Sequence, residues 1–260
     1  MSRRDPNPQH RRVSIRLGVL ALCLGLAASA CSASDEGAPL VVSAASSLAG
    51  AFEELARSFE STSPGIEVQL NVAGSTRLAE QIVEGAPVDV FASANIAAID
   101  RVVDSGDAAT QVVVFAHNTM AIGVPPGNPA NVASLTDFDR HALILGACAS
   151  AVPCGSYSDA AFSKAGVTPV LDTREPDAGA LVLKLGLGEV DAGVIYVSDV
   201  VGAAGAIDGI DIPPSENVRA TYPIAVIGDS GTHPLADAFV AFVLSDDGRA
   251  VLASYGFDLP

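Results

Sequence analysis

Residues 40–60 read LVVSAASSLAGAFEELARSFE and join an apolar run to a helical pattern. The first six of these residues are apolar or small, which predicts a strand. From Leu48 to Phe59, leucine, alanine and phenylalanine recur at intervals of three and four residues, which predicts a helix with one apolar face. The pair Ser46-Ser47 lies at the junction of the two elements.

Two more units of the same kind follow along the chain. IEVQLNVA (66–73) alternates like a strand, VDVFAS (88–93) is another short strand candidate, and a helical pattern comes after each. Strands that alternate with helices predict parallel βαβ units. The sequence therefore predicts an α/β fold.

A long apolar stretch in the middle separates this series from a second one. QVVVFAHNTMAIGV (111–124) ends at two prolines and is expected to cross from one lobe to another. The second series comprises ALILGA (142–147), a helix after Gly155, a helix near 178–187 and AGVIYV (192–197), and RATYPIAVI (219–227) is the expected return crossing. We therefore expect two βα lobes joined by two crossing strands. Residues 39–118 plus 227–260 would form the first lobe, and 119–226 the second.

The first thirty residues have the pattern of an export signal. Five arginines precede an apolar run from Leu17 to Ala30, which is shorter than the ~20 residues of a membrane span. We interpret 1–30 as a signal peptide, Cys31 as a lipidated first residue and 31–38 as the anchor and its polar tether. Ordinary secretion with cleavage nearby is the alternative. The expected location is extracytoplasmic, on the cell membrane.

Composition and charge limit the classes of partner. With 49% hydrophobic and 17% charged residues, the chain has ample material for a folded core. Beyond the signal segment it has 9 basic and 29 acidic residues, a net charge of −20, and no basic stripe. Binding to nucleic acid is therefore not expected. Binding of a small anion stays possible where local dipoles hold it.

Two cysteines remain after the signal segment and the anchor. Cys148 and Cys154 lie close together in a chain exported to an oxidising compartment, which favours a disulfide between them. Two free buried thiols are the alternative. The nearest histidine, His141, has no partner at a metal-ligand spacing, so we expect no metal coordinated by side chains.

The residues at four expected helix starts are small or polar. Two lie in each expected lobe: Ser46-Ser47, Gly74-Ser75-Thr76, Pro153-Cys154-Gly155-Ser156 and Asp177-Ala178-Gly179. Ser156 and Asp159 fit a capping box at the third start. Helix N-termini expose unpaired N–H groups and carry about half a positive charge, so they bind oxyanions without lysine or arginine. Together the four starts predict an anion site at the carboxyl ends of the strands.

Blocks of the sequence resemble the periplasmic molybdate-binding protein family. They are VVSAASSLAGAFEELARSFE (41–60), AGSTRLAEQIVEGAPVDVFASAN (73–95), VPCGSY (152–157) and PDAGALVLKLGLGEVDAGVIYVSD (176–199). The resemblance runs from about residue 40 to YGF (255–257) and implies a type II periplasmic-binding-protein fold with the ligand between the lobes. It also implies a monomeric solute-binding protein, not an enzyme, without a cofactor. Its ligand would be molybdate or tungstate, delivered to the permease and ATPase subunits of an ABC importer.

The resemblance assigns a role to five residues. Ser47 and Ser75 would offer hydroxyl and backbone N–H groups from the first lobe. Cys154 and Ala178 would offer backbone N–H groups from the second lobe, and Tyr196 its phenol. For Tyr196 the alternative is a half-buried aromatic residue at the end of a strand.

Physical chemistry supports these roles. Molybdate and tungstate are fully deprotonated at neutral pH, so they only accept hydrogen bonds, and each bond to a charged group contributes ~1.5–3 kcal/mol before the costs of association. This chain has Cys154 where the family commonly has a smaller residue, which is tolerable if only the backbone is used. Asp177 would either cap its own helix or face the cleft, where it would repel a dianion.

Other functions compete with this interpretation. A pocket of donors suits sulfate or another oxyanion as well, while ferric iron is disfavoured because Tyr196 has no adjacent tyrosine. Gly228-Asp229-Ser230-Gly231 spells a serine-protease motif, so a secreted hydrolase is a remote alternative. No histidine-bearing segment supplies a base, and a surface turn is the preferred interpretation of this tetrapeptide.

Overall fold

The chain builds a mixed sheet of nine strands within the residues that the structure describes, 39–228 and 234–260. The structure is a computed structural model. Eight strands follow the order β2-β1-β3-β9-β4-β7-β5-β6, and β8 pairs with β4 beside this path. Both ends of the sheet are parallel and its middle is antiparallel. The predicted α/β class is confirmed.

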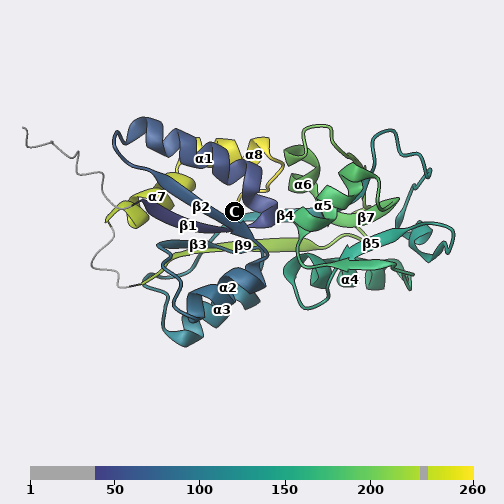
Figure 1. Cartoon of the computed structure of the whole chain (residues 1–260), viewed down its shortest axis with the longest axis horizontal. Helices are drawn as coiled ribbons and strands as arrows, with labels where there is room; N and C mark the ends of the chain where they lie inside the picture. Colours follow the sequence, from purple (N-terminus) through teal and green to yellow (C-terminus); the bar gives the residue numbers. More distant parts are fainter. Residues whose placement is uncertain (1–38, 229–233) are drawn as a thin grey trace, which may run out of the picture. The chain divides into compact units, whose positions relative to one another are not determined.

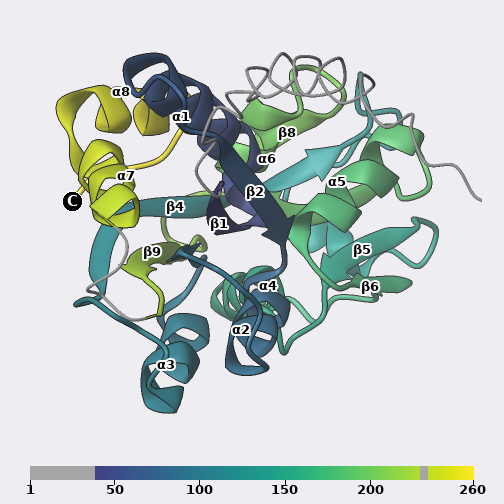
Figure 2. The same ribbon diagram turned by 60° about the vertical axis from the view of Figure 1, so that its left-hand side comes forward.

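Three parallel strands form one end of the sheet: β1 (Leu40–Ala45), β2 (Val68–Ala73) and β3 (Val90–Ala92). Five α-helices flank them: α1 (Ala49–Thr62), α2 (Ser75–Val83), α3 (Ile96–Ser105), α7 (Pro234–Leu244) and α8 (Asp246–Ser254). α1 and α8 lie over one face, and α2 and α3 lie over the opposite face (Figures 1 and 2). We name this group of elements the first lobe.

Two long strands lead from this group to the rest of the sheet. β4 (Val113–Val124) and β9 (Arg219–Val226) pair with each other in antiparallel register, from Val113 opposite Ile224 to Thr119 opposite Arg219. The end of β9 pairs with β3, and the end of β4 pairs with β7 and β8. Figure 1 shows both strands running between the two groups of elements.

The remaining elements form a second group, which we name the second lobe. Its strands are β5 (Leu145–Cys148), β6 (Thr173–Glu175), β7 (Ala192–Tyr196) and β8 (Asp208–Asp211). Its helices are α4 (Pro153–Ala165), α5 (Ala178–Leu187), α6 (Val197–Gly202) and the 3-10 helix η2 (Leu135–Asp139). α4 and α5 lie on opposite sides of β5 and β7 (Figure 1). A further 3-10 helix, η1 (Ser46–Leu48), joins β1 to α1.

One expected helix start is wrong in position. α4 begins at Pro153, not after Gly155, and its N-cap is Val152, whose side chain makes no cap. Ser156 therefore lies inside the first turn, where its hydroxyl donates to the carbonyl of Pro153 instead of capping the helix. Proline suits the first helical position because the N–H that it lacks would have no helical partner there.

The apolar core extends through both lobes. Its largest cluster includes Phe52 of α1, Phe115 of β4 and Phe162 of α4, all nearly inaccessible to solvent. Phe52 packs edge-on against Phe115 and Phe239, with ring centroids 5.9 and 6.3 Å apart. Aromatic residues from α1, β4 and α7 meet here. The segments that come before and after the second lobe in the sequence therefore share one core.

Several expectations concern residues outside the described ranges. The signal peptide (1–30), Cys31 and the tether up to residue 38 are among them, as are three residues of the Gly228–Gly231 tetrapeptide. Among the described residues, no helix combines the length and the apolar character needed to cross a bilayer.

Candidate oxyanion site

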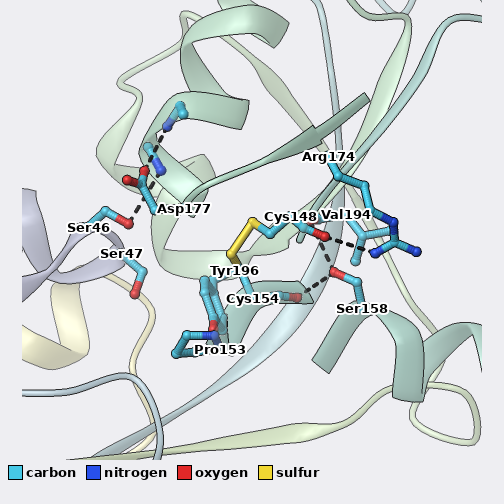
Figure 3. The surroundings of a disulfide bond; sticks show 12 residues. Ser46, Ser47, Cys148, Pro153, Cys154, Ser158, Arg174, Asp177, Val194 and Tyr196 are labelled. Atoms are coloured by element: carbon cyan, nitrogen blue, oxygen red, sulfur yellow. Dashed lines mark hydrogen bonds between the residues drawn. A yellow bond between two sulfur atoms is a disulfide. The ribbon is translucent and has the colours of Figure 1, made fainter. Parts of the chain in front are cut away.

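A pocket lies where the helix starts of the two lobes face one another. It is small and opens to solvent. Ser46 and Ser47 approach it from one side, and Asp177, Cys154 and Tyr196 approach from the other (Figure 3). The lining residues are Ala45, Ser46, Ser47, Gly74, Ser75, Ala94, Val152, Pro153, Cys154, Asp177, Ala178 and Tyr196. All five residues to which the sequence assigned a binding role are among them.

Ser47 lies in η1, directly after β1, and is buried. Its hydroxyl oxygen is 2.8 Å from the hydroxyl oxygen of Tyr222 on β9. Its carbonyl accepts a hydrogen bond of 2.9 Å from the hydroxyl of Ser198, the second residue of α6. The position of Ser47 is therefore set by two buried side chains, one on a long strand and one from the second lobe.

Ser75 is the first residue of α2, after Gly74 as N-cap. Its hydroxyl oxygen accepts a hydrogen bond of 3.0 Å from the backbone N–H of Ala94. Because that bond uses a lone pair of the oxygen, the hydroxyl proton of Ser75 is left to donate to another acceptor. Ser75 can thus present its hydroxyl and its N–H to an anion in the pocket.

Cys154 lies in the first turn of α4, and the structure joins it to Cys148 at the end of β5 by a disulfide. This bond ties the start of the helix to the strand before it (Figure 3). Arg174 also holds this loop, since its guanidinium donates to the carbonyl of Cys148 and the hydroxyl of Ser150, both at 3.0 Å. The backbone of Cys154 is thereby fixed beside the pocket.

Asp177 and Ala178 form the start of α5. The carboxylate of Asp177 caps its own helix, accepting a hydrogen bond of 3.0 Å from the N–H of Ala180, and it also lines the pocket. The two alternatives considered for this residue therefore both apply in part. Ala178, the first helical residue, presents a backbone N–H that needs no bond within the helix. An anion beside it gains from the helix start and meets repulsion from Asp177.

Tyr196 ends β7 and is 1% exposed. Among the described residues, its hydroxyl is the one buried side-chain polar atom without a hydrogen-bond partner. Burial raises the pKa of Tyr196 well above its usual range, so the phenol stays protonated and remains a donor. A buried donor without a partner costs ~1–3 kcal/mol, and a ligand in the pocket would remove that cost.

Asp199 is a buried acid behind the pocket, at the start of α6. One of its oxygens accepts a hydrogen bond of 2.9 Å from the N–H of Tyr196. Burial raises the pKa of Asp199 to about 7, the hydrogen bond opposes this shift, and the charge of Asp177 adds to it. A second cavity, which Ser46, Ser47 and Ser198 also line, reaches this carboxyl group.

The chemistry of the pocket favours an acceptor that carries no proton. Its donors are four hydroxyl groups, those of Ser46, Ser47, Ser75 and Tyr196, and the first N–H groups of helices from both lobes, and no lysine or arginine lines it. No cluster of three or more histidine, cysteine or acidic residues able to hold a metal occurs among the described residues. Hydroxyl and helix-start donors are the groups that bind tetrahedral oxyanions through hydrogen bonds alone.

Three residues behind the pocket were missed by sequence reasoning: Asn118, Ser198 and Tyr222. They are buried and hydrogen-bonded to each other or to Ser47. Tyr222 is 175 positions from Ser47 in the sequence. It belongs to a strand pattern that gives no reason to single out its hydroxyl, so no local signal could have identified it.

Comparisons with known proteins agree on one family. Residues 40–258 match the model of the bacterial extracellular solute-binding proteins. The molybdate-binding protein ModA of Mycobacterium tuberculosis is 36% identical over 221 residues, which cover 85% of each chain. ModA of Escherichia coli is 28% identical over 237 residues, covering 86% of this chain and 90% of that one.

Solved structures show the same fold at lower identity. The periplasmic molybdate-binding protein of Azotobacter vinelandii superposes with a TM-score of 0.72 at 20% identity, covering 85% of this chain and 99% of that one. The sulfate-binding protein SubI of Mycobacterium tuberculosis superposes with a TM-score of 0.75 at 16% identity, with coverages of 85% and 86%. The type II periplasmic-binding fold that the sequence resemblance implied is confirmed.

Proposed function

Since this chain belongs to the family of bacterial extracellular solute-binding proteins, we propose that it captures molybdate or tungstate outside the cytoplasm and passes it to an ABC importer. The partners would be the permease and ATPase subunits of that importer. Members of this family bind solutes and do not convert them, so we assign no catalytic residue and no cofactor.

The hydroxyl of Tyr196 carries the proposal. It is a buried donor without a partner, and it lines the same pocket as Ser47 and Ser75. With the N–H groups of Cys154 and Ala178, these donors suit a large dianion that accepts hydrogen bonds and gives none. Monohydrogen phosphate would point its proton toward groups that are themselves donors. The acidic side chain that lines the pocket, Asp177, already accepts a hydrogen bond from the N–H of Ala180.

Sulfate is the second candidate, because it too carries no proton at neutral pH. A fold shared with a sulfate-binding protein is compatible with this alternative. Size must then separate the two anions, since molybdate and tungstate are larger than sulfate. We propose the larger anions because the relatives of higher sequence identity are molybdate-binding proteins.

We also propose the arrangement of the chain around this function. Residues 39–118 with 227–260 would form one lobe and 119–226 the other, closing on the ligand as a monomer. Lipid on Cys31 would hold the protein at the outer face of the cell membrane after residues 1–30 are removed.

Calorimetric titration tests the ligand. Protein comprising residues 32–260 is titrated with molybdate, tungstate, sulfate and phosphate in the same buffer. We expect binding of one anion per chain, with molybdate and tungstate at least tenfold tighter than sulfate. Equal affinity for sulfate would contradict the molybdate assignment, and no binding of any of the four anions would contradict the oxyanion function.

A further inference from the structure

Tyr222 contacts the oxyanion site from behind, without lining it. It lies on β9, is fully buried, and its hydroxyl oxygen is 2.8 Å from that of Ser47. Its ring is fixed edge-on against Tyr196 and Phe257, with centroids 5.9 and 5.2 Å away. The hydroxyl of Tyr222, on a strand that joins the lobes, therefore contacts Ser47, one of the residues proposed to bind the ligand.

The hydrogen bonds that lead from Asn118 to Ser47 have a fixed direction. The carbonyl oxygen of the Asn118 side chain accepts from the N–H of Thr119 at 2.9 Å, so its amide nitrogen faces the other way. That nitrogen donates to the hydroxyl of Ser198 at 2.8 Å. The bonds from Asn118 to Ser198 and from Ser198 to Ser47 thus each have one direction, whereas in the pair of Ser47 and Tyr222 either hydroxyl could be the donor.

Ser47 has one proton and two candidate acceptors, the phenol and the bound anion. An anion without protons can only accept, so the proton of Ser47 must point into the pocket when the ligand is bound. With its proton used in this way, Ser47 can only accept in the bond to Tyr222. Tyr222 is then the donor, which the geometry allows because either atom of that pair can be the donor. The carbonyl of Ser47 is held separately by Ser198. All bonds of the network thus point toward Ser47.

We propose that Tyr222 is a positioning residue, whose hydroxyl donates to Ser47 and thereby holds the proton of Ser47 on the bound oxyanion. This inference rests on the proposed function and adds a source of selectivity. A serine that is kept as a donor favours ligands without a proton over protonated oxyanions.

A double-mutant cycle tests the inference. Molybdate affinity is measured by calorimetry for the wild type, Tyr222→Phe, Ser47→Ala and the double variant. We expect Tyr222→Phe to weaken binding about tenfold when Ser47 is present and less than about twofold when it is alanine, because the phenol acts through the serine. Tyr157→Phe is the matched control: it removes a phenol that accepts from Thr221 and does not touch Ser47, so it should leave affinity unchanged.

A second measurement separates positioning from a packing defect. In Tyr222→Phe, Ser47 is free to accept, so the affinity for monohydrogen phosphate should fall less than that for molybdate. Equal losses with and without Ser47, or no loss at all, would overturn the role of Tyr222 while leaving the proposed function intact. A wild type that binds no oxyanion would refute the proposed function and this inference with it. Denaturant unfolding of each variant verifies that the ring still packs.

Discussion

The hydroxyl of Tyr196 should affect ligand binding and stability in opposite directions. Tyr196→Phe removes a donor to a charged ligand, so we expect the affinity for molybdate to fall by ~1.5–3 kcal/mol. The same change removes a buried hydroxyl that has no partner, so the free energy of unfolding without ligand should stay the same or rise. Calorimetry and urea unfolding measure the two quantities. A variant with lower stability and unchanged affinity would mean that the phenol serves packing alone.

Asp199 should make stability depend on pH. Its pKa in the folded protein, about 7, is above its ordinary value of 3.8, so between these values the folded state holds the proton more tightly than the unfolded state. The contribution of Asp199 to stability therefore falls as the pH rises from about 4 to about 7. Asp199→Asn should match the wild type near pH 4 and be the more stable protein at pH 8. Urea unfolding across this range checks it, and a constant difference between the two proteins would contradict it.

At this scale, sequence could identify the residues at the pocket but not those behind it. Periodicity places Ser47, Ser75, Cys154 and Ala178 in the four expected helix starts. The family resemblance assigned their roles and added Tyr196. The orientation of their hydroxyl groups depends on partners far away in the sequence. The hydrogen bond between Tyr222 and Ser47 exists because β1 and β9 lie on either side of β3 in one sheet, and no local pattern encodes that.

Among the elements, the start of α4 should be the most sensitive to a single added carbon. A Cβ atom at Gly155 would lie 1.9 Å from the carbonyl oxygen of Ala149, a backbone atom of the disulfide loop. Gly155→Ala should therefore lower the free energy of unfolding by ~1–3 kcal/mol and weaken molybdate binding, because the N–H of Cys154 shifts with the loop.

Gly202 provides the matched control for this prediction. It lies in α6, and a Cβ atom there would meet nothing within 4 Å. Gly202→Ala should leave affinity unchanged and raise stability by up to about 1 kcal/mol. Thermal unfolding and calorimetry on both variants give the comparison, and similar behaviour of the two glycines would show that the close approach at Gly155 is without consequence.

The elements with clear apolar runs or helical spacing followed from sequence, the short apolar strand β3 among them, whereas two short polar strands did not. β1, β4, β9 and α5 were predicted within two residues of their bounds because their apolar runs or helical spacing are long. β6 (TRE) and β8 (DGID) are short and polar, and they form strands because neighbouring strands supply their hydrogen bonds. The helix that the sequence predicts after Gly155 begins at Pro153, because proline suits the first position of a helix.

At the scale of the whole molecule, the net charge of the protein and the charge of the proposed ligand are both negative. The mature chain would carry a net charge of −20, and the proposed ligand is a dianion. Long-range repulsion should slow association at low salt, and screening should relieve it. We expect the association rate constant for molybdate to rise with ionic strength and the dissociation rate constant to change little. Stopped-flow tyrosine fluorescence measures both, and an association rate that falls with salt would show that local positive potential dominates.

The position of the bound metal atom tests the central claim most directly. Crystals of the protein with molybdate are measured at the molybdenum absorption edge, where anomalous scattering locates that atom alone. We predict one strong peak per chain in the pocket, with the oxygens of the anion within hydrogen-bond distance of the hydroxyls of Ser47, Ser75 and Tyr196. A peak elsewhere on the molecule, or a pocket without one at saturating molybdate, would contradict the account.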